Sequence, residues 1–197
     1  NRLVEIPHIS KYLVNTGTLS IWYKHFNDKG MLYSKDSNGY DTGGHVYLEM
    51  NAKRLAARLQ GVNTSNNVQM GNSSPALNGQ NQWHLAVLTF GTGGMILYLD
   101  GEAMDINAAY KGGLGTSSGG TGNREPIAIG ANTYKSGDLT NFPAEDYFQG
   151  QVDEFRIYDR ELSGNEVFNL LENRTTTNDY QTFDLISGAE DNASFQI

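Results

Sequence analysis

The chain has 197 residues, no cysteine, and 14 Lys and Arg against 22 Asp and Glu, which gives a formal net charge of −8. The absence of cysteine excludes disulfides, thiol catalysis and cysteine-bound zinc. The lack of a basic stripe argues against nucleic acid and anionic membranes as partners, and no apolar run is long enough to span a membrane. Because the sequence begins at Asn1 without a basic and apolar leader, we expect a segment of a longer protein or a mature chain.

Alternation of apolar and polar residues, which is typical of half-buried strands, begins in GTLSIWYKH (17–25). Leu19, Ile21 and Tyr23 share one face of this strand, and Trp22 lies on the other. The first face is therefore expected to point into a core, and the second to point outward.

The runs HVYLEM (45–50) and RLAARLQ (54–60) alternate in the same way and are predicted to pair as a hairpin. Antiparallel neighbours share a face, so the apolar sets of the two strands meet. The second face then collects four polar or aromatic side chains, which are Tyr47, Glu49, Arg54 and Arg58.

QWHLAVLTF (82–90) and GMILYLD (94–100) form a second predicted hairpin, which is apolar on both faces and is therefore expected in the middle of a covered sheet. PIAIG (126–130) and YFQGQVDEFRIY (147–158) supply further strands. Many short strands between turn signals predict an antiparallel β-sandwich.

Three connections are long for simple loops, namely 34–44, 111–125 and 131–147. Loops of this length are usually functional or mobile. The first and third carry a polar set that a sandwich could bring to one rim, although ordinary hydrophilic loop composition explains the same residues. This set comprises Asp36, Asn38, Tyr40, Asp41, Asp138, Asn141, Glu145, Asp146 and Tyr147.

The strand that contains QVDEFRIY carries an acidic residue at a position where an apolar one is expected. Strict alternation places Asp153 on the inward face with Phe155 and Ile157, and it places Glu154 on the opposite face. An inward carboxylate costs several kcal/mol of desolvation unless it is paired, hydrogen-bonded or bound to a metal. Two alternatives to a metal site remain open. The Asp153 carboxylate accepts backbone N–H bonds from a neighbouring loop, or a bulge turns the Asp153 side chain outward.

A helix is predicted over 163–172. Ser163 and Glu166 have the spacing of a capping box, and Val167, Leu170 and Leu171 form an apolar stripe that would hold the helix against a sheet. The residues that follow are polar and typical of a linker.

Three stretches in chain order resemble the LamG-like, concanavalin A-like lectin and glucanase jelly-roll superfamily: TGTLSIWYK, NQWHLAVLTFGTGGMILYLDGE and FQGQVDEFRIYDRELSGNEV. The resemblance implies an all-β, antiparallel jelly-roll β-sandwich with one short C-terminal helix over residues 1–174. Residues 175–197 are then a linker and the possible start of a following repeat, because GAEDNASFQI (188–197) resembles the opening strand of a cadherin-like repeat. Large bacterial adhesins are built in this way.

Similar modules often use the Asp of the closing strand to hold a structural calcium, together with loop carbonyls and a second acidic residue. The resemblance therefore implies calcium as the cofactor, with Asp153, Asp146 and Asp36 as candidate ligands. Calcium takes 6–8 oxygen ligands.

Two groups of residues are candidates for ligand binding. One is the polar set of the loops, where calcium beside a Tyr and Asn rim would hold sugar hydroxyls or a peptide carboxylate. The other is the outward face, where aromatic rings stack on sugars while Arg and Glu supply hydrogen bonds. A solvated hairpin face with internal ion pairs explains that second group equally well. Its members are Trp22, Tyr47, Glu49, Arg54 and Arg58.

Catalysis finds little support. His8, His25, His45 and His84 are isolated in the sequence, and no nucleophile elbow, HExxH or phosphate-binding loop is present. The paired acids of the superfamily's glucanases are missing, and adjacent acids on one strand cannot flank a glycosidic bond.

We therefore expect a non-enzymatic, extracellular or cell-surface recognition module of a bacterial adhesin or polysaccharide-handling protein. Calcium-dependent carbohydrate binding is the leading hypothesis. Binding of a cell-surface protein or peptide is the alternative, and a structural spacer is the third. Neighbouring domains of the same chain are expected partners.

Overall fold

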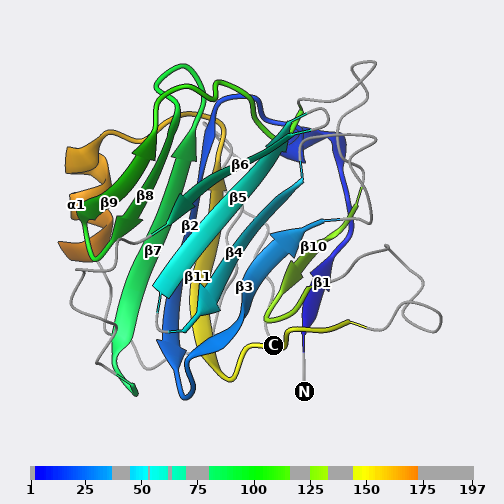
Figure 1. Cartoon of the computed structure of the whole chain (residues 1–197), viewed down its shortest axis with the longest axis vertical. Helices are drawn as coiled ribbons and strands as arrows, with labels where there is room; N and C mark the ends of the chain where they lie inside the picture. Colours follow the sequence, from blue (N-terminus) through cyan, green and yellow to red (C-terminus); the bar gives the residue numbers. More distant parts are fainter. Residues whose placement is uncertain are drawn as a thin grey trace.

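The computed structural model describes residues 3–36, 45–52, 54–61, 64–69, 80–115, 125–132 and 144–172. Its strands form two antiparallel sheets that face each other (Figure 1). One sheet has six strands in the order β1 (Val4–Ile6), β10 (Ile127–Ile129), β3 (Lys29–Lys35), β4 (Val46–Asn51), β5 (Arg54–Gly61) and β6 (Thr64–Gln69). The other has five, in the order β11 (Gly150–Tyr158), β2 (Gly17–His25), β7 (Trp83–Phe90), β8 (Met95–Leu99) and β9 (Glu102–Asn107). The predicted all-β jelly-roll sandwich is confirmed.

The predicted hairpins pair as the alternation requires. Leu48 of β4 lies opposite Ala57 of β5 on the inner face, and Tyr47 lies opposite Arg58 on the outer face. Inner residues of both sheets form one core cluster. The hydrophobic effect of this shared interior holds the layers together, because the inner faces of the two sheets bury each other.

The turn between β8 and β9 shows how local chemistry places a strand. Asp100 and Gly101 have φ of 48° and 84°, and positive φ at both central residues is what a tight type I′ hairpin turn requires. Asp100 also anchors the neighbouring strand, because its Oδ1 accepts the Leu85 backbone N–H at 2.8 Å.

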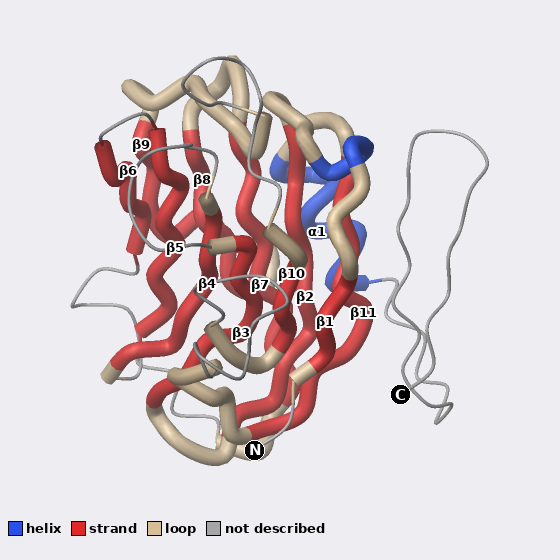
Figure 2. The backbone as a smooth tube through the Cα atoms, turned by 90° about the vertical axis from the view of Figure 1, so that its right-hand side faces the viewer, coloured by secondary structure: helices blue, strands red, loops and turns tan. Residues whose placement is uncertain are grey.

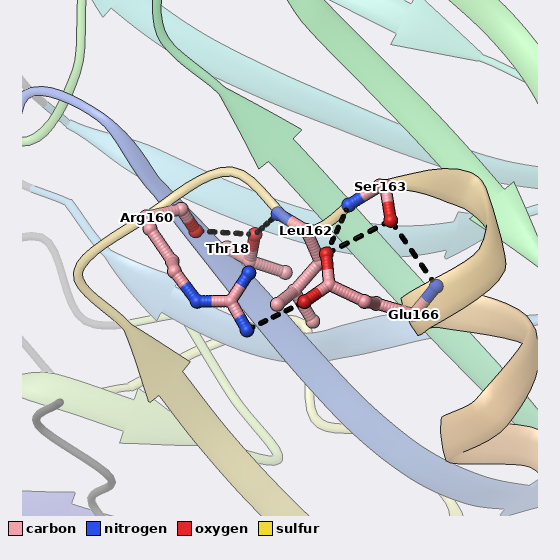
Figure 3. Close-up of polar contacts among 5 residues, drawn as sticks. All are labelled: Thr18, Arg160, Leu162, Ser163 and Glu166. Atoms are coloured by element: carbon pink, nitrogen blue, oxygen red, sulfur yellow. Dashed lines mark hydrogen bonds and ion pairs between the residues drawn. The ribbon is translucent and has the colours of Figure 1, made fainter. Parts of the chain in front are cut away.

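Helix α1 (Gly164–Glu172) covers the outer side of the five-stranded sheet, away from the six-stranded sheet (Figure 2). Its capping box is formed as predicted, since the Ser163 backbone N–H donates to Glu166 Oε2 at 2.8 Å and the Glu166 N–H donates to Ser163 Oγ at 3.3 Å (Figure 3). Val167 is fully buried in a second cluster that lies beneath the helix.

The predicted position of Trp22 beside Tyr47 is wrong. Trp22 belongs to β2 in the five-stranded sheet, is only 5% exposed, and packs with Leu85 and Val167 beneath the helix. The alternation correctly separated Trp22 from the core face. However, the covering helix turns this outward side chain into part of a second interior, so its ring cannot stack on a ligand.

The inward orientation expected for Asp153 is also wrong, and the bulge alternative is the one observed. The register of β11 against β2 shifts between Asp153 and Arg156, and Glu154 has φ of 47°. Asp153 therefore lies opposite Trp22 on the helix side, where its Oδ1 accepts the Glu154 N–H at 2.8 Å.

Glu154 lies on that same side, contrary to the expectation that the two acids point to opposite faces. Its Oε2 is 2.9 Å from Nη2 of Arg156, and Arg156 is opposite Ser20 in the register. The inserted residue of a bulge allows two consecutive side chains to share a face.

None of the helices in the described ranges is long and apolar enough to cross a membrane. The predicted boundary near residue 174 and the linker over 175–197 lie outside the described residues.

Candidate functional site

The outer face of β4 and β5 holds a cation–π pair. The Arg58 guanidinium lies 4.4 Å from the centre of the Tyr47 ring, and the two residues are opposite each other in the register. Arg58 Nη2 also lies 2.8 Å from Asp36 Oδ2. The arginine therefore links an aromatic ring at the surface to a carboxylate beneath it.

Asp36 and His45 form the buried floor of this face. Their side chains are 3% and 1% exposed, and His45 Nδ1 lies 3.3 Å from Asp36 Oδ1. A buried carboxylate needs such partners, because removing one leaves an uncompensated charge. Asp36 thus holds Arg58 over Tyr47, which makes it a positioning residue for the outer face.

A polar pocket of about 350 Å³ opens beside the beginning of β3 and the end of β4. Its walls combine two carboxylates, two amides, one amine and one phenol ring with backbone. They are formed by Lys29, Gly30, Glu49, Met50, Asn51, Asp146, Tyr147 and Gln149.

The segment that precedes β11 is fixed to β3 by backbone contacts. The Met31 N–H donates to Asp146 O at 2.8 Å, and Tyr147 forms an isolated bridge with Met31. Gly30 permits this close approach, because a Cβ there would lie 2.6 Å from Phe148 Cα and 2.8 Å from Tyr147 O, and its φ is +131°. One wall of the pocket therefore depends on the absence of a side chain at position 30.

Glu49 is the residue that links the pocket to the outer face. Burial raises the pKa of its carboxyl above the usual range, the nearby Asp146 raises that pKa further, and Arg58 opposes both effects. The pocket therefore places two acidic groups within electrostatic reach of each other, beside an arginine and a lysine.

The structure brings part of the predicted set together. Asp146 and Tyr147 line the pocket with Glu49, and Tyr47 and Arg58 adjoin it on the same face. Arg54 is exposed at the beginning of β5, opposite Asn51, which also lines the pocket. Their role in ligand binding stays a prediction.

The three candidate calcium ligands do not form one cluster. Asp36 follows the end of β3, Asp146 contacts the beginning of β3, and Asp153 belongs to the other sheet. Within the residues that the structure describes, no group of three His, Cys, Asp or Glu side chains gathers around a common point.

Some predicted residues lie outside the described part of the chain. Glu145 is described and exposed, and its backbone pairs with Asn132. The residues that are not described are Asn38, Tyr40, Asp41, Asp138 and Asn141.

The sequence reasoning missed five pocket residues: Lys29, Gly30, Met50, Asn51 and Gln149. Lys29 and Asn51 are opposite each other at the ends of β3 and β4, so correct pairing of these two strands would have identified them. Nothing in the local sequence marks Gln149, which reaches the pocket only through the contact of its segment with β3.

Comparison with known proteins agrees with this architecture. The family model Laminin_G_3, described as the concanavalin A-like lectin/glucanases superfamily, matches residues 1–168. The chain therefore belongs to this superfamily. No curated protein sequence matches the chain.

Solved structures of similar fold include glycan-binding domains. A Ruminococcus gnavus sialidase CBM40 bound to α2,3 sialyllactose has a TM-score of 0.61 and 16% identity, over 87% of this chain and 97% of that one. A botulinum neurotoxin D ligand-binding domain in complex with N-acetylneuraminic acid has a TM-score of 0.62 and 16% identity, over 87% of this chain and 40% of that one. A pentraxin from Limulus polyphemus has a TM-score of 0.58 and 12% identity, over 98% of this chain and 91% of that one.

The chain spans less than half the length of the neurotoxin domains that it matches, 43% and 41% in two of them. At these identities the likeness defines the fold alone. Two of the named neighbours are described with a bound glycan, sialyllactose and N-acetylneuraminic acid.

Proposed function

We propose that this chain is a non-catalytic carbohydrate-binding module. Its binding site would be the 350 Å³ pocket beside β3 and β4, together with the adjoining Tyr47–Arg58 face. The observation that carries the proposal is the composition of the pocket, which places carboxylates, amides and a phenol ring at one opening. Sugar recognition uses such polar groups to orient hydroxyls, with an aromatic ring to cover the apolar face.

Each side chain has a separate part in this proposal. The carboxylates of Glu49 and Asp146 would accept hydrogen bonds from hydroxyls, and the amides of Asn51 and Gln149 would both donate and accept. Tyr147 would supply the aromatic surface. Arg58 already covers Tyr47, so we assign the stacking role to Tyr147.

A glycan array, followed by calorimetry with the best glycan, tests the proposal. Tyr147→Ala and Asp146→Asn should each weaken binding about tenfold or more, as expected for one lost contact of roughly 1.4 kcal/mol. Glu102→Gln is the matched control, because this acid is exposed on β9 in the other sheet. It should bind as the unchanged chain does.

Other outcomes would overturn the proposal in distinguishable ways. Silence on the array with capture of a cell-surface peptide would support the protein-binding alternative, and silence in both would support a spacer. Release of reducing ends from a bound glycan would contradict a non-catalytic module.

We also propose calcium as the ion of this pocket. Its donors fit in type, because the carboxylates of Glu49 and Asp146 and the amide oxygens of Asn51 and Gln149 are hard oxygen ligands. Asp36 fits less well, since its carboxylate faces Arg58 and His45. At Asp153 one carboxylate oxygen accepts the Glu154 N–H.

Thermal melting in calcium and in EGTA tests this proposal. An ion that binds only the folded chain raises its melting temperature, and Asp146→Asn should reduce that rise. Equal melting temperatures in the two buffers would contradict the calcium proposal and leave calcium-independent glycan binding intact.

The proposed setting is extracellular or at a cell surface, beside further domains of a longer protein. An acidic, cysteine-free, lectin-like sandwich suits that setting. Antibody labelling of intact source cells checks it, and labelling only after permeabilisation would contradict it.

A further inference from the structure

A group of buried polar side chains lies between the two sheets, on the inner side of the segment that forms one wall of the pocket. Tyr23 and His25 belong to the inner face of β2, and His84 of β7 lies opposite Tyr23. Tyr23 and His25 are 0% exposed, and the His84 side chain is 13% exposed. Tyr23 belongs to the apolar core cluster, and buried polar atoms such as these need hydrogen-bond partners.

Three atoms of this group lack a hydrogen-bond partner, and they are Tyr23 Oη, His25 Nε2 and His84 Nε2. The three rings form a near-equilateral triangle. Ring centres are 5.7 Å apart for Tyr23 and His84, and 6.3 Å apart for both Tyr23 and His25 and the two histidines. Two imidazoles on one tetrahedral ion, with metal–nitrogen bonds of about 2 Å, have ring centres roughly 5 Å apart, so the two histidine rings would approach each other by about 1 Å to share one ion.

The other nitrogen of each imidazole is already committed. His25 Nδ1 lies 2.9 Å from the Asn27 carbonyl oxygen, and His84 Nδ1 lies 2.7 Å from Asp100 Oδ2. A carbonyl and a carboxylate only accept, so both Nδ1 atoms donate. In the neutral ring this leaves a lone pair on each Nε2.

Histidines that bind metals are oriented in this way, with the second nitrogen donating to a carboxylate or a backbone carbonyl. We propose that Tyr23, His25 and His84 bind one divalent transition-metal ion, with Zn²⁺ as the natural candidate, between the two sheets. Imidazole suits zinc, and the negative charge of Asp100 offsets part of the charge of the ion.

This site differs from the proposed calcium site in place and in chemistry. Its donors are two nitrogens and a phenol oxygen, whereas the pocket offers carboxylates and amides. The absence of a three-member His, Cys, Asp or Glu group among the described residues is consistent with it, because tyrosine is the third ligand here.

Co²⁺ titration of the tag-free chain, after treatment with EDTA, tests the proposal. We expect saturable visible absorption at one Co²⁺ per chain, which Zn²⁺ abolishes by displacement. Tyr23→Phe should weaken Co²⁺ binding by about tenfold or more, as expected for a lost ligand or one of its supports.

Asp100→Asn is the sharper variant, because it removes no ligand. The amide NH₂ would face His84 Nδ1 and favour the tautomer with the proton on Nε2, which cannot bind a metal. The amide oxygen can still accept the Leu85 N–H, and Asn tolerates the φ of 48° at this position. We expect a loss of affinity of about 10- to 100-fold, with the fold retained.

Asp159→Asn is the matched control, since Asp159 is exposed beyond β11, and His8→Gln tests for binding to an unrelated histidine. Both should leave the absorption unchanged. The proposal is overturned if the unchanged chain shows no saturable absorption, if Asp100→Asn binds Co²⁺ as well as the unchanged chain does, or if His8→Gln abolishes binding. A single internal water would then satisfy the three atoms.

Discussion

At the scale of single residues, the outer face depends on a buried carboxylate. Asp36 is nearly inaccessible and faces Arg58 on one oxygen and His45 on the other. A buried charge needs a partner, because removing one member of a buried ion pair costs more stability than the intact pair contributes. Arg58 was recognised from the hairpin alternation and Asp36 from the composition of its loop, whereas His45 was set aside as isolated.

Arg58→Leu should destabilise the chain by about 3 kcal/mol, the lower end of the range for breaking a buried pair, because His45 remains beside Asp36. Arg54→Leu is the control. This arginine is exposed on the same strand, so its replacement should change stability by less than about 0.5 kcal/mol. Urea denaturation of the two variants measures the difference, and equal midpoints would contradict the role given to Asp36.

At the scale of elements, the N-terminal contacts and the apolar stripe of helix α1 hold it against the five-stranded sheet. Ser163 and Glu166 close the capping box, and Arg160 Nη2 lies 2.7 Å from Glu166 Oε1 (Figure 3). Thr18 Oγ1 donates to Arg160 O at 2.8 Å and accepts the Leu162 N–H at 2.9 Å. The chain that enters the helix is thereby tied to β2.

The capping box predicts a stability change with acid pH. The hydrogen bond from Arg160 and those from Ser163 lower the pKa of Glu166 from 4.5 to about 2. The pKa of Glu166 is lower in the folded chain than in the unfolded chain. The stability that the ionised Glu166 contributes is therefore complete above pH 4.5 and is lost as the pH falls through about 2.

Ser163→Ala should destabilise the chain by about 1 kcal/mol at neutral pH. Glu166→Gln should remove the part of the pH dependence of stability that arises from ionisation of Glu166. Urea midpoints between neutral pH and pH 2 measure both effects. A Glu166→Gln variant that keeps the full acid sensitivity of the unchanged chain would contradict this assignment.

At the scale of the whole molecule, β2 couples the two interiors. Ile21 points into the cluster between the sheets, and Trp22 points into the cluster beneath the helix. Because one strand supplies both clusters, neither interior can open without disturbing the other.

We therefore expect a single cooperative unfolding transition. The two tryptophans of the chain, Trp22 and Trp83, both pack in or against the cluster beneath the helix, so their fluorescence follows that side. Far-ultraviolet circular dichroism follows the strands of both sheets. The two probes should give the same midpoint, and two separate midpoints would contradict the coupling through β2.

The sequence alone determined the features that depend on local periodicity and short-range chemistry. Alternation identified the strand of Leu19 and Ile21 and the hairpin that pairs Tyr47 with Arg58, because a pleated strand turns successive side chains to opposite faces. The spacing of Ser163 and Glu166 identified the beginning of the helix, since a capping box forms within a single turn.

Only the tertiary structure decided the features that join distant parts of the chain. The bulge at Glu154 reversed the predicted face of Asp153, because one inserted residue breaks the alternation between the residues before it and those after it, and Phe155 and Ile157 stay inward. The helix buried Trp22, and the contact of Met31 with Asp146 brought Tyr147 beside Glu49. The proposed binding pocket is formed by separate segments of the chain, and their contact depends on how the two sheets and their connections pack.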